Sequence, residues 1–392
     1  MTRRKNARHS SRVGTFVLAG ALLAATCVML PGCGSNDGGG GEPPPPACDA
    51  AQTMAIQTSF ADEAIPSDVG AVALVKDACG SRYFTRGAAQ AVPETALQLI
   101  GSNTKTYIAS LILLLVRDGK LSLSDPVTKW IPDVPGGDAL KIDHLLHHTS
   151  GIYNYTSDAS FLGDAVSHRA FTPRDLLDIA FSHPPSFLPG EAGKWEYSNT
   201  NYVILGMIIV SVTGEEVAQV LRERILTPIG AQATFFNGSE PLIGVVAYGQ
   251  SFLRTNGAHF MDPSAAWCAG NVVAAIDDVV DWAEKRGNGS FHSPAMQAAM
   301  LKGVPTGQGF TYGAALVMVD EAGLNGNGPA IGHGGDSVGY HMLVYYFPKK
   351  QVTIAVIVDS DKGPTTGFPF GDTYLGDMYM TVVNPYFGTH PG

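Results

Sequence analysis

Strand-like segments lie near both ends of this chain, and the long stretch between them contains few. Near the N-terminus, apolar and β-branched runs cover 69–76 and 82–87, and the glycine-containing turn between them predicts a hairpin. Three more runs follow the middle of the chain, at 310–320, 339–347 and 352–359. This order predicts an α/β fold, with one antiparallel sheet built from both chain ends, flanked by helices, and a mostly helical lobe inserted at about 121–282. A ligand site is expected in the cleft between the sheet and this lobe.

Helical patterns flank the predicted strands. One covers 51–64 and another lies near 372–383. The strongest begins at Ser102 and ends near Gly119, with a broad apolar face made by Tyr107, Ile108, Leu111, Leu114 and Leu115. We expect this helix to be buried on most sides.

The first 32 residues are typical of an export signal, with basic residues through Arg12, an apolar run over 13–30 and small residues before Cys33. Leu30-Pro31-Gly32-Cys33 resembles the lipobox of bacterial lipoproteins, which implies lipidation of Cys33. Ordinary signal cleavage nearby is the alternative. Residues 33–50 predict a Gly/Pro-rich tether, and 51–388 a catalytic domain. The expected product is exported to the bacterial periplasm or cell envelope and held at a membrane by its lipid.

The charge of the chain argues against nucleic acid as a partner. Five of the 25 lysines and arginines lie in the first twelve residues, so the remainder carries 20 basic against 35 acidic side chains. A surface this acidic repels phosphate backbones.

Three of the five cysteines remain if Cys27 is cleaved off with the signal and Cys33 is acylated. They allow a disulfide between Cys48 and Cys79, and because three is an odd number, at least one thiol, such as Cys268, stays free.

Ser102 and Lys105 form the first motif with chemical meaning. Residues three apart on a helix share one face, and an amine held in a partly dry site can act as the base for a serine nucleophile. Alone the spacing is weak, because a helix-capping serine beside a surface lysine gives the same pattern.

Two other motifs add to it. Tyr197 and Asn199 follow Pro189-Gly190. A tyrosine with a depressed pKa can relay a proton, while the Asn199 amide can donate to a substrate carbonyl and to the neighbourhood of Lys105. In His333-Gly334-Gly335, the glycines would let substrate lie along a strand edge while the imidazole faces the cleft.

Taken together, these motifs resemble the family of class C β-lactamases, serine D-Ala-D-Ala carboxypeptidases, D-aminopeptidases and related esterases. The likeness extends over about 66–358 and includes the blocks 119–126, 144–151, 189–190, 197–199 and 332–335. It implies a β-lactamase/DD-peptidase-like fold and an acyl-enzyme on Ser102, with Lys105 and Tyr197 moving its proton. It also implies an oxyanion site made by the backbone N–H groups of Ser102 and Asp336. No metal or cofactor is needed for this chemistry.

The chain departs from class C β-lactamases where His333 replaces their lysine, a form seen in some carboxypeptidases and D-aminopeptidases. Carboxypeptidases and β-lactamases must also hold a substrate carboxylate, which a guanidinium does best. No arginine follows Arg286, and Asp336 adds a negative charge to the expected site. We therefore expect short esters or D-amino-acid amides to be favoured, with D-Ala-D-Ala carboxypeptidase or weak β-lactamase activity as the alternative.

The sequence allows three other interpretations. Ser337 lies in a Gly-x-Ser-x-Gly pattern, but a nucleophile elbow needs a strand before it and a helix after it, and neither is expected there. His144, His147 and His148 have the spacing of helical zinc ligands without the accompanying glutamate, so we expect them to pack beneath the tyrosine loop. A non-catalytic penicillin-binding receptor would keep the same fold.

Overall fold

The computed structural model describes residues 49–61, 70–87, 95–246, 261–324, 326–337, 339–358 and 373–388. The expected signal peptide at 1–32, Cys33 and the tether up to Cys48 lie outside these residues. Cys79 is disulfide-bonded, and Cys48, its expected partner, is among the residues not described. Cys268 is a buried free thiol.

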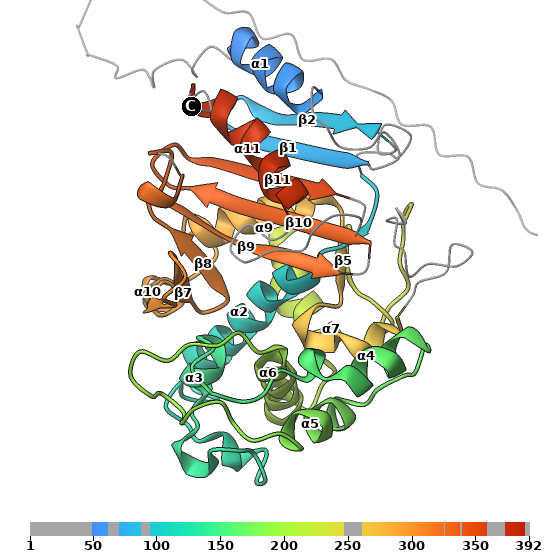
Figure 1. Cartoon of the computed structure of the whole chain (residues 1–392), viewed down its shortest axis with the longest axis vertical. Helices are drawn as coiled ribbons and strands as arrows, with labels where there is room; N and C mark the ends of the chain where they lie inside the picture. Colours follow the sequence, from blue (N-terminus) through green and yellow to red (C-terminus); the bar gives the residue numbers. More distant parts are fainter. Residues whose placement is uncertain are drawn as a thin grey trace, which may run out of the picture. The chain divides into compact units, whose positions relative to one another are not determined.

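An eight-stranded antiparallel sheet forms the centre of the described chain, in the order β2-β1-β11-β10-β9-β8-β7-β6 (Figure 1). Its strands are β1 (Ala71–Asp77), β2 (Gly80–Arg86), β6 (Val304–Pro305), β7 (Thr311–Gly313), β8 (Leu316–Val319), β9 (Ala330–Ser337), β10 (Tyr340–Phe347) and β11 (Val352–Val358). Strand β1 pairs with both β2 and β11, and Ala71 lies opposite Val358. The prediction of one sheet built from both chain ends is confirmed.

Both faces of the sheet are covered by helices. Strand β11 is buried along its whole length because its side chains alternate between two cores. Ile354 and Val356 pack with α11 (Thr373–Phe387) and α1 (Ala50–Ala61), while Ala355 and Ile357 face the core that contains α2 (Thr104–Arg117) and α9 (Ile276–Gly287). Figure 1 shows α11 in front of the sheet and α9 behind it.

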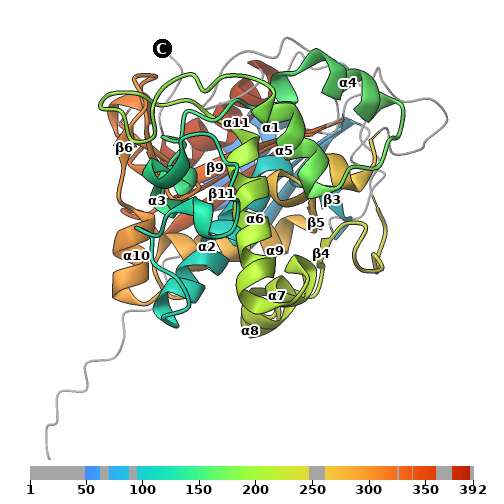
Figure 2. The same ribbon diagram turned by 90° about the horizontal axis from the view of Figure 1, so that it is seen from below.

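Helix α2 is buried at every residue from Thr104 to Leu115. Each large apolar side chain that it buries contributes about 1.5–3 kcal/mol to folding. The lobe around it consists of α3 (Ile142–Leu146), α4 (Ala159–Val166), α5 (Pro173–Phe181), α6 (Asn199–Thr213), α7 (Val217–Leu221) and α8 (Thr227–Ile229), and α10 (Pro294–Met300) packs against α2 from outside it. In Figure 2 α6 lies in front of the sheet, where it contacts α2, α3 and α5.

Single-turn helices connect these elements. They are η2 (Gly101–Asn103), η3 (Val127–Lys129), η4 (Gly137–Ala139), η5 (Tyr155–Ser157), η7 (Pro263–Ala265), η8 (Trp267–Ala269) and η9 (Ala322–Leu324), with a π-helical segment, η6, at Arg222–Leu226. The lobe also carries a small sheet that the sequence did not predict, β3-β5-β4, made of Gln98–Leu99, Val272–Ala274 and Thr234–Phe236. The helical insert was expected to end near 282, but 282 lies within α9, which packs on β10 and β11. The chain therefore returns from the lobe to the sheet at Ile276, where α9 begins.

Two C-terminal segments differ from the sequence prediction. The expected strand 310–320 is a hairpin of β7 and β8, turned at Ala314 and Ala315. The expectation that no strand precedes Ser337 is wrong, because β9 begins at Ala330, ends at Ser337 and pairs with β10. His333-Gly334-Gly335 therefore lies inside β9, and a strand rather than a helix follows Ser337.

No single helix in the described ranges is long and apolar enough to cross a membrane. One pair, α6 with Val217–Ile229, meets the length and composition test jointly, but it is bent by 83°.

Candidate active site

Ser102 lies in the η2 turn that leads into α2, and two glycines let the backbone of β9 pass directly against this turn. A Cβ atom on Gly101, whose φ is +50°, would lie 2.6 Å from the carbonyl oxygen of Asp336. A Cβ atom on Gly335 would lie 2.0 Å from the carbonyl oxygen of Ile100. Only glycine fits at these two positions. The close approach sets the backbone of Asp336 beside Ser102.

Lys105 lies one helical turn after Ser102 and is completely buried. Its Nζ is 2.9 Å from the Ser102 Oγ, 2.7 Å from the Asn199 Oδ1 and 2.5 Å from the carbonyl oxygen of Ala269. Burial lowers the pKa of Lys105 well below its ordinary 10.5, and the Asp336 carboxylate opposes this shift only in part. The amine is thus disposed to be neutral and to accept a proton from Ser102.

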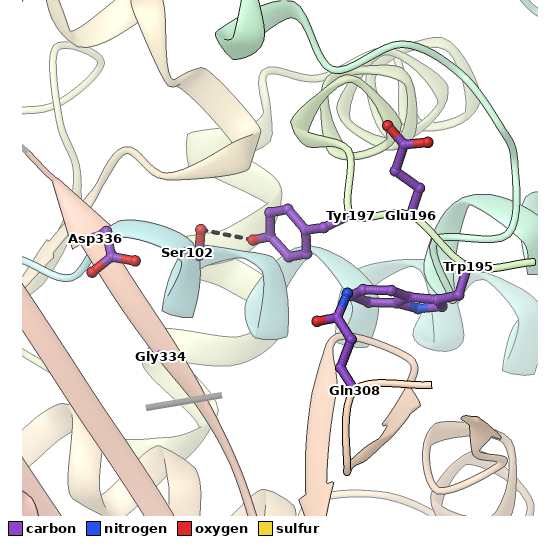
Figure 3. Close-up of a pocket in the computed structure, with 7 residues that line it drawn as sticks. All are labelled: Ser102, Trp195, Glu196, Tyr197, Gln308, Gly334 and Asp336. Carbon is purple, nitrogen blue, oxygen red and sulfur yellow. Dashed lines mark hydrogen bonds between the residues drawn. The ribbon is translucent and has the colours of Figure 1, made fainter. Parts of the chain in front are cut away.

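Tyr197 completes the contacts of the Ser102 side chain, because its hydroxyl donates to the Ser102 Oγ at 2.8 Å (Figure 3). The expectation of a depressed tyrosine pKa is wrong. Burial raises the pKa of Tyr197, and the Asp336 carboxylate raises it further. Tyr197 is therefore a neutral hydrogen-bond donor, and Lys105 is the group with the lowered pKa.

Asn199 binds the Lys105 amine, and both ends of its side-chain amide are hydrogen-bonded within the protein. Its Oδ1 accepts from Lys105, and its Nδ2 donates to the Thr156 Oγ1 at 3.0 Å. The expected donation to a substrate carbonyl would require this second bond to break. Asn199 is the first residue of α6, so the lobe fixes the orientation of Lys105 through it.

His148 supports the tyrosine loop from below, as expected from the sequence. Its ring lies 4.3 Å from that of Tyr197, and its Nδ1 accepts from the Ser198 N–H at 3.2 Å and from the Asn201 Nδ2 at 3.1 Å. Burial lowers its pKa far below the usual value, which keeps the ring neutral. The tyrosine loop therefore packs on an uncharged aromatic ring.

The other two histidines of that block have partners of their own. The His144 Nδ1 accepts from the Lys141 N–H at 3.2 Å, and the ring packs beneath Gly190. The His147 Nδ1 donates to the carbonyl oxygen of Asp143 at 2.8 Å. Across the described part of the chain, no three His, Cys, Asp or Glu side chains are grouped as metal ligands.

His333 does not face the cleft, which corrects the expectation from the sequence. The ring is fully buried; its Nδ1 donates to the carbonyl oxygen of Gly334 at 2.5 Å, and its Nε2 accepts from the Tyr312 hydroxyl at 2.9 Å. Burial lowers its pKa to about 3, so it is neutral. It braces β9 behind the site instead of meeting substrate.

A cavity of about 370 Å³ opens onto Ser102. It is lined by Ser102, Trp195, Glu196, Tyr197, Gln308, Gly334 and Asp336 (Figure 3). Sequence reasoning missed Trp195, Glu196 and Gln308. The first two directly precede Tyr197, so their position was the only available signal, whereas Gln308 comes from the turn between β6 and β7. Two of the lining side chains are carboxylates and none is a cation.

The arginines that could have reached the cavity from the lobe are paired elsewhere. Ion pairs join Arg169 to Asp164, Arg174 to Asp133, Arg222 to Glu240 and Arg224 to Asp118. Arg286 is fully buried in α9, and none of its three guanidinium nitrogens has a hydrogen-bond partner among the described residues. Burial lowers its pKa to about 10. Arg254 lies outside the described ranges.

A family model described as Beta-lactamase matches residues 61–369. The chain belongs to the beta-lactamase family. Among curated relatives of this beta-lactamase-family chain, the putative penicillin-binding protein PbpX of Bacillus subtilis is 31% identical over 220 residues, which are 55% of this chain and 51% of the relative. Esterase EstB of Burkholderia gladioli is 31% identical over 221 residues, 51% and 56% of the two chains. The chain thus spans about half the length of these relatives.

Solved structures of the family extend the likeness to most of the chain. A D-stereospecific amidohydrolase from Streptomyces sp. matches with a TM-score of 0.70 and 27% identity, over 87% of this chain and 99% of the other. D-amino acid amidase from Ochrobactrum anthropi SV3 matches with a TM-score of 0.73 and 26% identity, over 85% and 99%. The expected α/β fold is confirmed.

Proposed function

We propose that this protein is a serine hydrolase that forms an acyl-enzyme on Ser102 and cleaves an ester or amide bond. The observation that carries the proposal is the pair of contacts to the Ser102 Oγ, from the Lys105 Nζ at 2.9 Å and the Tyr197 hydroxyl at 2.8 Å. A buried amine with a lowered pKa and a neutral phenol supply a base and an acid on either side of one hydroxyl.

The proposed reaction has two steps. Neutral Lys105 takes the Ser102 proton as Oγ bonds to the substrate carbonyl carbon, and backbone N–H groups of Ser102 and Asp336 stabilise the oxyanion. Tyr197 donates its proton to the leaving alcohol or amine as the bond to the carbonyl carbon breaks, and the Lys105 ammonium reprotonates it. Water then attacks the ester, which releases the acid and restores Ser102.

The side chains that line the cavity favour uncharged or amine-bearing substrates, such as short esters or D-amino-acid amides. No cationic side chain is among the described residues that line it, and a substrate carboxylate entering it would lose hydration without gaining a charged partner from them. The names of similar proteins, an esterase and a D-amino acid amidase, agree with this preference. Similarity to putative D-alanyl-D-alanine carboxypeptidases favours the alternative that the substrate is a D-Ala-D-Ala peptide.

Mass spectrometry after a fluorophosphonate probe tests the nucleophile. Ser102→Ala should abolish labelling and hydrolysis, whereas the control Ser337→Ala, at the end of β9, should keep both. Labelling that survives the first change would refute the assignment. A comparison of kcat/KM for p-nitrophenyl butyrate, D-alanine p-nitroanilide, nitrocefin and diacetyl-Lys-D-Ala-D-Ala then ranks the substrates. A lead for the peptide would favour the carboxypeptidase, and acylation without turnover would favour a penicillin-binding receptor.

A further inference from the structure

Asp336 is the penultimate residue of β9 and lies directly opposite His341 of β10 in the antiparallel register. Opposed residues in such a pair extend from the same face of the sheet. Here the Asp336 Oδ1 and the His341 Nδ1 are 2.8 Å apart. The carboxylate side chain is 62% exposed, whereas the imidazole is 6% exposed. A buried donor thus holds an accessible carboxylate in one orientation at the cavity wall.

Asp336 lines the same cavity as Ser102. The backbone of Asp336 is packed against Gly101, the residue before Ser102, and Figure 3 shows the carboxylate on the opposite side of Ser102 from Tyr197. Its charge is felt by both proton-transfer groups, since it raises the pKa of Lys105 and of Tyr197. The carboxylate therefore acts on the same small region in which the carbonyl of a substrate must react.

A fixed negative charge at this point favours the ammonium form of Lys105 but disfavours the oxyanion that forms on the substrate. Attack on a carbonyl creates an oxyanion, which a neighbouring carboxylate destabilises. The described lining of the cavity offers no cationic side chain to offset it. The compensating charge can instead come with the substrate, because an α-ammonium group is only two bonds from the carbonyl carbon.

We infer that the Asp336 carboxylate binds the α-ammonium group of an aminoacyl substrate and that His341 positions it. This inference rests on the proposed acyl-enzyme function and adds a specificity-determining residue to it. Asp336 thereby favours a positively charged acyl donor over an uncharged one of the same shape. Glu196 also lines the cavity, but Figure 3 places Tyr197 between it and Ser102, so we assign it no such contact.

Two anilides of matched shape test the ammonium contact. D-alanine p-nitroanilide and 2-methylpropanoyl p-nitroanilide differ only by an ammonium group in place of a methyl group. In the wild type, kcat/KM should favour the D-alanine compound, and Asp336→Asn should reduce this ratio about 10- to 100-fold, the usual worth of a hydrogen bond to a charged group. The matched control Glu196→Gln removes a charge from the same cavity and should change the ratio less than about threefold, as expected for a more distant charge.

The role of His341 as a positioning residue has its own readout. His341→Phe should raise KM for the D-alanine compound about tenfold or less, because the carboxylate remains but loses the donor that orients it. The KM for the methyl compound should change less, and His341→Gln, which can still donate, should recover part of the loss. A merely structural role would instead affect both substrates equally.

Competition with the fluorophosphonate probe gives the same ratio if anilide turnover is slow. D-alanine amide should protect Ser102 from labelling better than 2-methylpropanamide, and Asp336→Asn should remove the difference. An unchanged ratio in Asp336→Asn overturns the ammonium site while leaving the serine hydrolase intact. Failure of the wild type to acylate Ser102 at all overturns both proposals.

Discussion

Replacing Lys105 by methionine removes the proposed base while keeping a side chain of similar length in a fully buried site. The change abolishes three contacts of the amine, with the Ser102 Oγ, the Asn199 Oδ1 and the Ala269 carbonyl oxygen. Loss of a positioned proton-transfer group should slow fluorophosphonate labelling of Ser102 by about 10²–10⁴. The two protein acceptors left without a donor should each cost about 1–3 kcal/mol of stability.

Lys105→Arg is the matched control for charge. A guanidinium keeps the positive charge and can donate, but it stays protonated between pH 5 and 9 and so cannot take the Ser102 proton. If the lysine acts as a base, the arginine variant should label as slowly as the methionine variant. If the lysine acts only through its charge, the arginine variant should retain activity.

The lowered pKa of Lys105 also predicts two pH dependences. Labelling should accelerate with pH as the neutral amine forms and level off above the folded-state pKa. Between that pKa and 10.5 the native state binds fewer protons than the unfolded state, so the stability of the wild type relative to Lys105→Met should rise with pH. The slope should approach about 1.4 kcal/mol per pH unit within this window.

Labelling kinetics from pH 5 to 9 and urea unfolding over the same range measure both effects. Lys105→Met labelling within tenfold of the wild type at every pH would refute the base assignment. A wild-type rate that falls as pH rises would contradict the sign of the pKa shift.

Other predictions address the acid, the strand contact, the core and the anchor. Tyr197→Phe should slow acylation by about 10²–10⁴ and should affect anilides more than p-nitrophenyl esters, whose leaving group needs no proton. Gly335→Ala would place a Cβ atom 2.0 Å from a backbone oxygen, so it should displace β9 and abolish labelling while near-UV circular dichroism reports the shift. Arg286→Met should raise the free energy of unfolding in urea by about 1–4 kcal/mol, because it replaces a buried charge by an apolar group of similar size. We also propose the lipid anchor at Cys33, so Cys33→Ser should move the protein from the detergent phase to the aqueous phase and remove the lipid mass.

The contact between Ser102 and Lys105 could be predicted because the relation of the two residues is local. Ser102 and Lys105 are brought together by helical periodicity, which the sequence expresses directly. Tyr197 was predicted only because its motif resembles that of the family. No local pattern in the sequence indicates that Tyr197 contacts Ser102, which is far away in the chain. Its pKa could not be predicted, because burial in the assembled site decides the direction of the shift.

The errors in the fold have similar causes. Strand β9 was missed because Gly332, Gly334 and Gly335 interrupt any β-forming pattern, although the neighbouring strands impose the extended backbone. The β7–β8 hairpin was missed because its turn contains Ala314 and Ala315, with Ala315 at a φ of 57°, where a turn normally has glycine or asparagine. In both places tertiary contacts outweigh local preference.

The pairing of β1 with β11 has a consequence for how the chain folds. Ala71 cannot pair with Val358 until nearly the whole domain has been synthesised. Until then, β1 pairs only with β2, and its other edge stays unpaired. Such long-range pairing slows folding, and an exposed strand edge invites association with other chains. Residues 71–75, all buried in the finished sheet, are therefore the segment of a nascent or truncated chain that most needs protection from aggregation.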